Sequence, residues 1–175
     1  MTAPNQQPDN TNFLSPVGFK FLLKRAPTVN YFCQSASIPS ISLGEIIQDT
    51  PFTKIHHVGD KLVFDNFSLR FRVDEHLSNY LEIFNWLLAI GFPDDFNQYK
   101  AIADRPSRPS QGDVRSDATL MVLTSAGNPK VEVNLRDIFP IALSTLEFNS
   151  ATQDIEYLEA DVQFALTKFD INVLT

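Results

Sequence analysis

The sequence predicts a mainly β protein with one α-helix and one long apolar arm. Three observations support this: most apolar segments alternate with polar residues at the period of a strand, one segment has a helical pattern, and one apolar stretch is too long for a hairpin turn. With 175 residues, of which 43% are hydrophobic, the chain can fill one core, so we expect a single β domain over residues 16–175. Residues 1–15 are predicted to form an extended N-terminal arm, because the first twelve have no periodic apolar pattern.

The predicted strands combine alternating apolar residues with flanking turn residues. In the first of them Phe19, Phe21 and Leu23 share one face, and Gly127 lies in a turn that joins two later strands into a hairpin. The strands are predicted at residues 18–25, 30–38 after a turn at Pro27, 66–73, 119–124, 130–136, about 142–148 and about 157–171. Residues 93–117 contain "RPSRPSQGD", which is typical of a variable surface loop.

One helix is predicted at about residues 75–91. Asp74 can cap its N-terminus, Gly91 can take the left-handed position after its last turn, and Pro93 prevents continuation. A helical wheel gives one narrow polar or small stripe, formed by Ser78, Asn79, Glu82, Asn85 and Ala89.

The remaining arc of this helix is apolar and wider than one sheet can cover. Two covers fit it: long loops of the same chain, or a neighbouring subunit. We favour a subunit interface, and we expect it to include Tyr80, Ile83, Trp86 and Leu87.

An apolar stretch at about residues 39–62 predicts a protruding β-arm. It has a strand-like rhythm broken by Gly and Pro, and it is too apolar to be a disordered linker. A hairpin that leaves the domain would expose apolar side chains and strand edges to water unless another chain received it. We therefore expect a subunit interface at Ile41, Leu43, Ile46, Ile47, Phe52, Ile55 and Val58.

These motifs resemble a known family. "YFCQSASIP", the apolar arm, "VGDKLVFDNFSLRFRVDEH" and a helix with "FNWL" are similar to the tail tube proteins of contractile-tailed bacteriophages. The positions that match the pattern of the family are Cys33, Ile38, Pro39, Gly59, Asp60, Phe64, Asp65, Asp74, Glu75 and Trp86. The resemblance covers about residues 18 to 91 and is weaker from residue 93 onward.

The resemblance implies two packed antiparallel sheets, in a sandwich or barrel, with a flanking helix. It implies a structural virion protein that self-assembles into hexameric rings, which stack into the inner tail tube through which phage DNA passes. The implied partners are further copies of the chain, the sheath, and the baseplate and tail terminator proteins. The implied location is the phage tail, assembled in the bacterial host cytoplasm. A tube-like baseplate protein, or tube initiator, of the same fold is the alternative within this family.

Charge placement suggests which strand faces such a channel. From Asp137 to Thr175 the chain has seven acidic residues and one basic residue. On the last predicted strand Glu159 and Asp161 share a face, and repeated around a ring they would form an acidic wall that repels the phosphates of DNA. An ordinary solvated strand face is the alternative.

The sequence also disfavours several other functions. We expect no enzyme and no cofactor, because the chain has no phosphate-binding Gly-rich loop, GxSxG or HExxH motif. His56 and His57 would point to opposite faces of a strand, so we expect no metal site there. The net charge of −7 argues against tight nucleic-acid binding, and no apolar run is long enough for membrane insertion. A monomeric β-barrel that binds a small apolar ligand stays open as a function of a different class.

Overall fold

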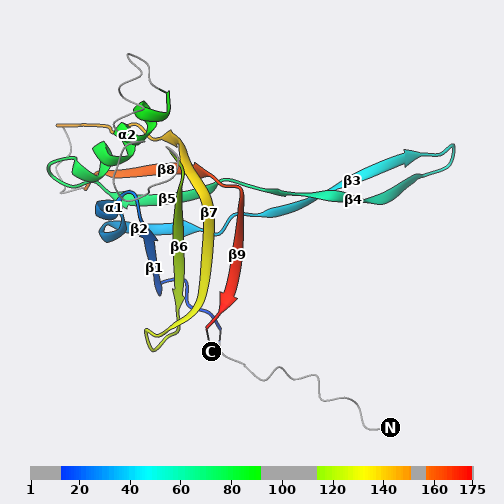
Figure 1. Ribbon diagram of the computed structural model, residues 1–175, viewed down its shortest axis with the longest axis horizontal. Coiled ribbons are helices and arrows are strands. Elements are labelled where there is room, and N and C mark those ends of the chain that lie inside the picture. Colours follow the sequence, from blue (N-terminus) through cyan, green and yellow to red (C-terminus); the bar gives the residue numbers. More distant parts are fainter. Residues whose placement is uncertain (1–12, 92–113, 151–156, 175) are drawn as a thin grey trace, which may run out of the picture.

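The computed structural model describes residues 13–91, 114–150 and 157–174. It has a mainly β body with a long two-stranded arm that leaves the body on one side (Figure 1). In chain order the elements are β1 (Phe19–Leu23), α1 (Pro27–Tyr31), β2 (Cys33–Ser37), β3 (Ile41–Asp49), β4 (Lys54–Phe64), β5 (Phe67–Arg72), α2 (Ser78–Gly91), β6 (Ser116–Leu123), β7 (Pro129–Leu143), β8 (Glu159–Ala165) and β9 (Lys168–Val173).

The body consists of two antiparallel sheets that share β7. The first half of β7 pairs with β6 and β9, and β6 pairs with β1; we call these four strands sheet 1. The second half of β7 pairs with β8, followed by β5 and β2; we call this group sheet 2. The strands of sheet 2 cross those of sheet 1 (Figure 1). The described strands form an open sandwich and no closed barrel, as expected for the sandwich form of the prediction.

Strand β7 passes between the sheets at a local bend. Asp137 has a left-handed φ of 55°, and its backbone N–H donates to Oδ1 of Asp117 at 3.3 Å. The register to β8 then shifts between Pro140 and Ala142. Such irregularities let one strand contribute to two crossing sheets.

The core lies between the two sheets and under α2. Phe67 of β5 is fully buried, with its ring centroid 5.4 Å from Phe21 of sheet 1 and 6.3 Å from Phe164 of β8. Trp86 of α2 lies 6.0 Å from the same Phe164 ring. The alternation of β5 explains this arrangement, because Phe67, Leu69 and Phe71 are buried whereas the intervening side chains are exposed.

The second predicted strand is shorter than expected. Residues Pro27–Tyr31 form the short helix α1, with Pro in its first turn, and the strand β2 begins only at Cys33. The side chain of Asn30 donates to the carbonyl oxygen of Leu23 at 3.2 Å and accepts from its N–H at 2.7 Å, which ties α1 to the end of β1.

The predictions for the closing strands were partly wrong. The predicted strand at 142–148 is the end of β7, which stops at Leu143, and the predicted strand at 157–171 is divided into β8 and β9. The predicted hairpin at Gly127 is confirmed: β6 and β7 pair, and Gly127 takes a φ of 81° in the turn between them.

Helix α2 begins at Ser78, so the prediction of a start beside Asp74 was wrong. Asp74 instead belongs to a preceding turn in which Leu77 has a φ of 57° and donates its N–H to the Asp74 carbonyl oxygen at 2.8 Å. The hydroxyl of Ser78 donates to the Asp74 carboxylate at 2.7 Å and lowers the pKa of that carboxyl below its ordinary value. Gly91 is the last helical residue and is not left-handed, contrary to the prediction.

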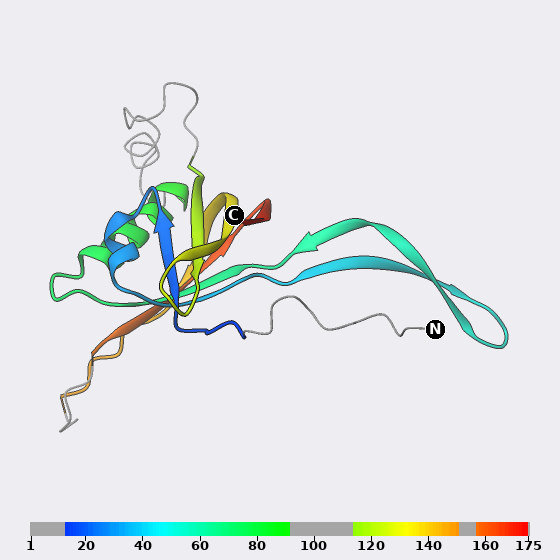
Figure 2. The ribbon, with the colours of Figure 1, turned by 90° about the horizontal axis from the view of Figure 1, so that it is seen from below.

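The arm is the hairpin of β3 and β4, which forms a separate two-stranded sheet. It extends away from the body as a continuation of β2 and β5 (Figures 1 and 2). Every residue of β3 is exposed, and in β4 all but Gly59 and Phe64 are. The fold prediction of a long protruding arm is therefore confirmed. The predicted loop at 93–117 and the N-terminal residues 1–12 lie largely outside the described residues.

Two glycines meet where the arm changes register. Leu43 pairs with Leu62, but Glu45 pairs with Val58, so β4 has extra residues opposite Gly44. A Cβ on Gly59 would lie 1.9 Å from the carbonyl oxygen of Gly44, which no side chain can do without a backbone shift. A Cβ on Gly44 would meet nothing closer than 4.0 Å.

This asymmetry predicts opposite outcomes for two similar substitutions. Gly59→Ala is expected to disrupt the bulge and raise hydrogen exchange of the β3 and β4 amides by about tenfold or more, since the paired backbone must separate. Gly44→Ala is the matched control and should leave exchange unchanged. Equal protection in the two variants, measured by mass spectrometry, would contradict the close approach.

Candidate assembly surfaces

The arm presents all its predicted interface residues to solvent. Phe52 at the tip is 98% exposed and Val58 is 84% exposed, and the register divides the other apolar side chains between both faces of the hairpin. The full set predicted for this surface is Ile41, Leu43, Ile46, Ile47, Phe52, Ile55 and Val58. None of these side chains belongs to the core of its own chain. A two-stranded ribbon with both faces open is marginal in water by itself, so the arm is a strong candidate for contact with another molecule.

The two histidines of the arm lie on opposite faces, as the alternation predicts. His56 bonds to the Glu45 carboxylate at 2.9 Å, whereas His57 bonds to the Gln48 side chain at 2.9 Å on the other face. Each is therefore part of a cross-strand pair. Among the described residues no cluster of three or more His, Cys, Asp or Glu side chains could hold a metal ion.

The predicted interface residues of helix α2 differ in how deeply they are buried in their own chain. Ile83 and Trp86 lie in the core of their own chain, at 0% and 2% exposure, and the indole N–H of Trp86 donates to the Val114 carbonyl oxygen at 2.7 Å. Tyr80 and Leu87 are half-buried at the edge of that core, and the Tyr80 hydroxyl donates to the Ser144 carbonyl oxygen at 3.1 Å.

The apolar side chains of α2 that remain exposed are Leu81 at 45% and Phe84 at 41%. Asn79 belongs to the polar stripe of the helical wheel, but it is fully buried. Its side chain donates to the Arg72 carbonyl oxygen at 2.7 Å and accepts from the N–H of Tyr80 at 2.9 Å. The side of the helix that is available to a second molecule is thus the Leu81 and Phe84 side.

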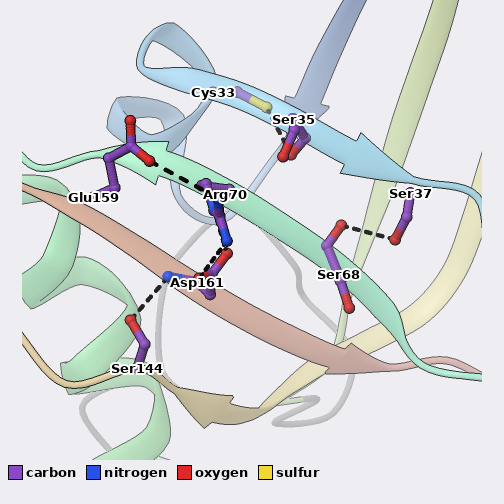
Figure 3. A network of polar contacts seen from close by, with 8 residues as sticks. All are labelled: Cys33, Ser35, Ser37, Ser68, Arg70, Ser144, Glu159 and Asp161. Atoms are coloured by element: carbon purple, nitrogen blue, oxygen red, sulfur yellow. Dashed lines mark hydrogen bonds and ion pairs between the residues drawn. The ribbon is translucent and has the colours of Figure 1, made fainter. Parts of the chain in front are cut away.

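The outward face of sheet 2 is polar (Figure 3). Arg70 of β5 donates to both carboxylate oxygens of Asp161 on β8, at 2.8 and 3.1 Å, and lies 4.0 Å from the Glu159 carboxylate. The hydrogen bonds and charge of Asp161 raise the pKa of Arg70. The hydroxyl of Ser37 donates to the Ser68 carbonyl oxygen at 3.3 Å on the same face.

Glu159 and Asp161 therefore lie on one face, as predicted, but together with arginines. Arg70 pairs directly with Asp161, and Arg72 lies over the Tyr157 ring at 5.3 Å. The sequence of β8 alone shows its acidic residues but not the basic residues of the neighbouring strand β5. The register of β5 and β8 puts Arg70 opposite Asp161 and Arg72 opposite Glu159, so the positive charges of β5 offset the negative charges of β8.

Cys33 is a half-buried thiol on the edge strand β2, opposite the buried Phe71 and packed against the core (Figure 3). Burial raises its pKa to about 11, so at pH 8 nearly all of it is protonated and unreactive. We expect iodoacetamide to alkylate Cys33 about 100-fold more slowly than an ordinary exposed cysteine. The control is Ser35→Cys in a Cys33→Ser background, because Ser35 is exposed on the same strand. Equal rates at the two positions, followed by mass spectrometry, would contradict the burial.

Solved structures share the fold of this chain over nearly its whole length. No family model matches the chain, and no curated protein sequence matches it. The tube-terminating cap of the anti-feeding prophage is similar with a TM-score of 0.59 and 16% identity, covering 99% of this chain and 100% of that one. The chain has a contractile-tail tube fold.

Two further structures share this tail-tube fold. A chain of the sheath–tube complex of the PVC extracellular contractile injection system gives a TM-score of 0.56 at 14% identity, with 94% of each chain covered. A chain of the sheath and tube terminator of the same kind of system gives 0.56 at 15% identity, covering 93% of this chain and 99% of that one. The shared fold therefore extends to the described strands after residue 113, beyond the segment that carries the sequence resemblance. In the part of the chain that the structure describes, no helix has the length and hydrophobicity to span a membrane.

Proposed function

We propose that the chain is a structural, non-enzymatic subunit of the tube of a contractile tail. Copies close into hexameric rings, and the rings stack into a tube inside a sheath. The observation that carries this proposal is the arm: β3 and β4 project from the body with exposed apolar side chains on both faces, which no other described part of the chain covers. The tube and tube-terminator structures that share the fold support the same role.

Sheet 2 is our candidate for the lumen wall of the ring. It has an open edge at β2, where a neighbouring copy could continue the sheet, and a polar outward face without exposed large apolar side chains on β5 or β8. The arginines of this face are already engaged, Arg70 by Asp161 and Arg72 over Tyr157. Passing phage DNA would therefore meet few cations that are free to hold its phosphates.

The partners and location follow from this role. The sheath would surround the tube, and the baseplate and terminator proteins would contact its two ends. A sheath–tube complex and a sheath and tube terminator are among the structures that share the fold, which supports the first and the last of these contacts. The subunit would reside in a phage tail after assembly in the host cytoplasm. A position at one end of the tube, as an initiator or as a cap, is the second candidate, favoured by the full-length match to a tube-terminating cap.

The monomeric ligand-binding barrel receives less support. The sandwich is open, and aromatic rings fill the space between the sheets, with Phe67 in contact distance of Phe21 and Phe164.

Sedimentation velocity and negative-stain microscopy of the purified chain over a range of concentrations test the proposal. Rings or tubes are the expected result, and rings that never stack would favour a tube-end position. A 19.7 kDa monomer at every concentration that takes up an apolar dye would refute the tube role and favour the ligand-binding barrel.

A further inference from the structure

The inner face of sheet 1 is only partly covered by the rest of the chain. The register aligns its inward side chains in three rows across β1, β6, β7 and β9. The row nearest sheet 2 is Leu23, Ala118, Leu135 and Phe169, and all four are buried at 8% exposure or less. In the next row Phe21, Leu120 and Val133 are buried, but Ile171 on the edge strand β9 is 55% exposed.

The third row, at the free end of the sheet, is apolar and only partly covered. It consists of Phe19, Val122, Val131 and Val173, and we call it the open row. Its first three side chains are only half-buried, and Val173 is 66% exposed. Four adjacent strands that each place a half-buried or exposed apolar side chain at one end of a sheet form an unusual surface for an isolated domain. This surface is suited to a second apolar element.

The arm has the right direction to cover the open row in another copy. In its own chain it continues the strands of sheet 2, and β5 and β8 already cross the covered end of sheet 1 (Figure 1). An arm from a copy displaced along the strands of sheet 1 would cross the open row in the same sense in which β5 and β8 cross the covered rows. The arm cannot cover its own open row, because it leads away from the body (Figure 2).

The arm also has the right length and chemistry. Its nine-residue strand β3 is about 30 Å long at roughly 3.3 Å per residue, whereas four strands at about 4.8 Å spacing make the open row roughly 15 Å wide. Its distal half exposes Ile46, Ile47 and Val58, so either face can offer aliphatic groups. Sheets that pack face to face commonly cross at either small or near-right angles, and the second of these is the geometry needed here.

We infer that the open row of sheet 1 is the seat for the arm of a neighbouring copy of this chain. The inference rests on the proposed function and adds to it the surface that receives the arm. Burial of Val173 and the rest of the row under β3 and β4 would join one copy to the next, with the exposed Ile171 at the margin of the contact.

Photo-crosslinking in the full-length chain tests this directly. p-Benzoylphenylalanine replaces Val58, the most exposed aliphatic side chain in the strands of the arm, and the variant is mixed with ¹⁵N-labelled unmodified chain before assembly and irradiation. Crosslinks from the arm to labelled residues 17–23, 119–124, 130–134 or 169–174 are expected. Crosslinks to α2 around Phe84, in particles that still assemble, would overturn the seat but leave the tube role intact. A chain that forms neither particles nor crosslinks would overturn both.

A substitution pair supplies an independent test. Val173→Asp puts a charge in the seat, and Leu22→Asp is its matched control, because Leu22 is 46% exposed on the opposite face of the same sheet. Val173→Asp should raise the concentration needed for assembly at least about tenfold, and Leu22→Asp should leave it unchanged, with both melting temperatures near that of the parent. Unchanged assembly of Val173→Asp would overturn the inference. So would a crosslinker at Val173 that reacts with residues 1–12 of its own copy.

Discussion

Replacing residues 44–61 with Asn-Gly is expected to give a folded chain that no longer builds tubes. Leu43 and Leu62 are a cross-strand pair, so a two-residue turn can join them without disturbing the root of the arm. The replacement removes side chains that are exposed in the isolated chain, whereas Phe64, whose ring lies 5.5 Å from Phe169, is retained. The body should therefore keep its core.

The measurements are thermal unfolding and electron microscopy on the same sample. The melting temperature is expected to stay within a few degrees of the parent, because mutations of exposed residues that make no core contact change stability little. Stacked tubes should be lost, although single rings can persist if sheet 2 alone closes the ring. Gly44→Ala, which leaves the arm in place, is the control for the preparation. Tubes of normal length from the shortened chain would mean that the arm has no part in stacking.

Local sequence patterns correctly predicted those elements in which the spacing of apolar residues or the residues of a turn determine the structure. In β5 every second residue is buried, and in the β6–β7 hairpin the turn needs a glycine, so period and turn chemistry suffice. The arm could also be predicted, because its apolar residues are interrupted by Gly and Pro; they remain exposed and contact no core residue among those that the structure describes. The element that local patterns missed altogether is α1, a five-residue helix held by Asn30 against the end of β1.

The remaining differences between prediction and structure concern residues whose environment is set by contacts with segments distant in the sequence. Pro140 indicates a break in a strand, yet β7 continues through it, because a register shift beside β8 accommodates the missing N–H. Asn79 lies on the polar stripe of the helical wheel, yet its amide satisfies backbone groups at the end of β5 and is buried there. No pattern within α2 alone shows that β5 ends beside it.

The candidate assembly surface shows the same division. Residues of the arm could be named from sequence because exposure there is uniform along both strands. On sheet 2 the two acidic residues were placed on the correct strand face, but their charge balance depends on the neighbour that β8 acquires in the fold. The open row could not be anticipated at all, since Phe19, Val122, Val131 and Val173 become neighbours only through three strand pairings.

Trp86→Ala and Phe84→Ala are expected to separate the two sides of α2. Trp86 is 2% exposed, contacts Phe164 and bonds to the Val114 carbonyl oxygen, so its truncation leaves a cavity and an unpaired carbonyl group. The expected loss is about 3–5 kcal/mol of unfolding free energy, or roughly 10 °C in melting temperature for a chain of this size. Phe84→Ala should change unfolding free energy by no more than about 1 kcal/mol, because that side chain is 41% exposed.

Assembly should respond in the reverse order if the Leu81 and Phe84 side of α2 meets another molecule. Below its own melting temperature Trp86→Ala keeps the exposed side chains of the helix and should still form tubes, whereas Phe84→Ala loses an apolar contact and should need a higher concentration to do so. Urea unfolding and sedimentation, run on both variants, measure the two effects separately. A Phe84→Ala chain that assembles like the parent would show that Phe84 makes no contact on which assembly depends.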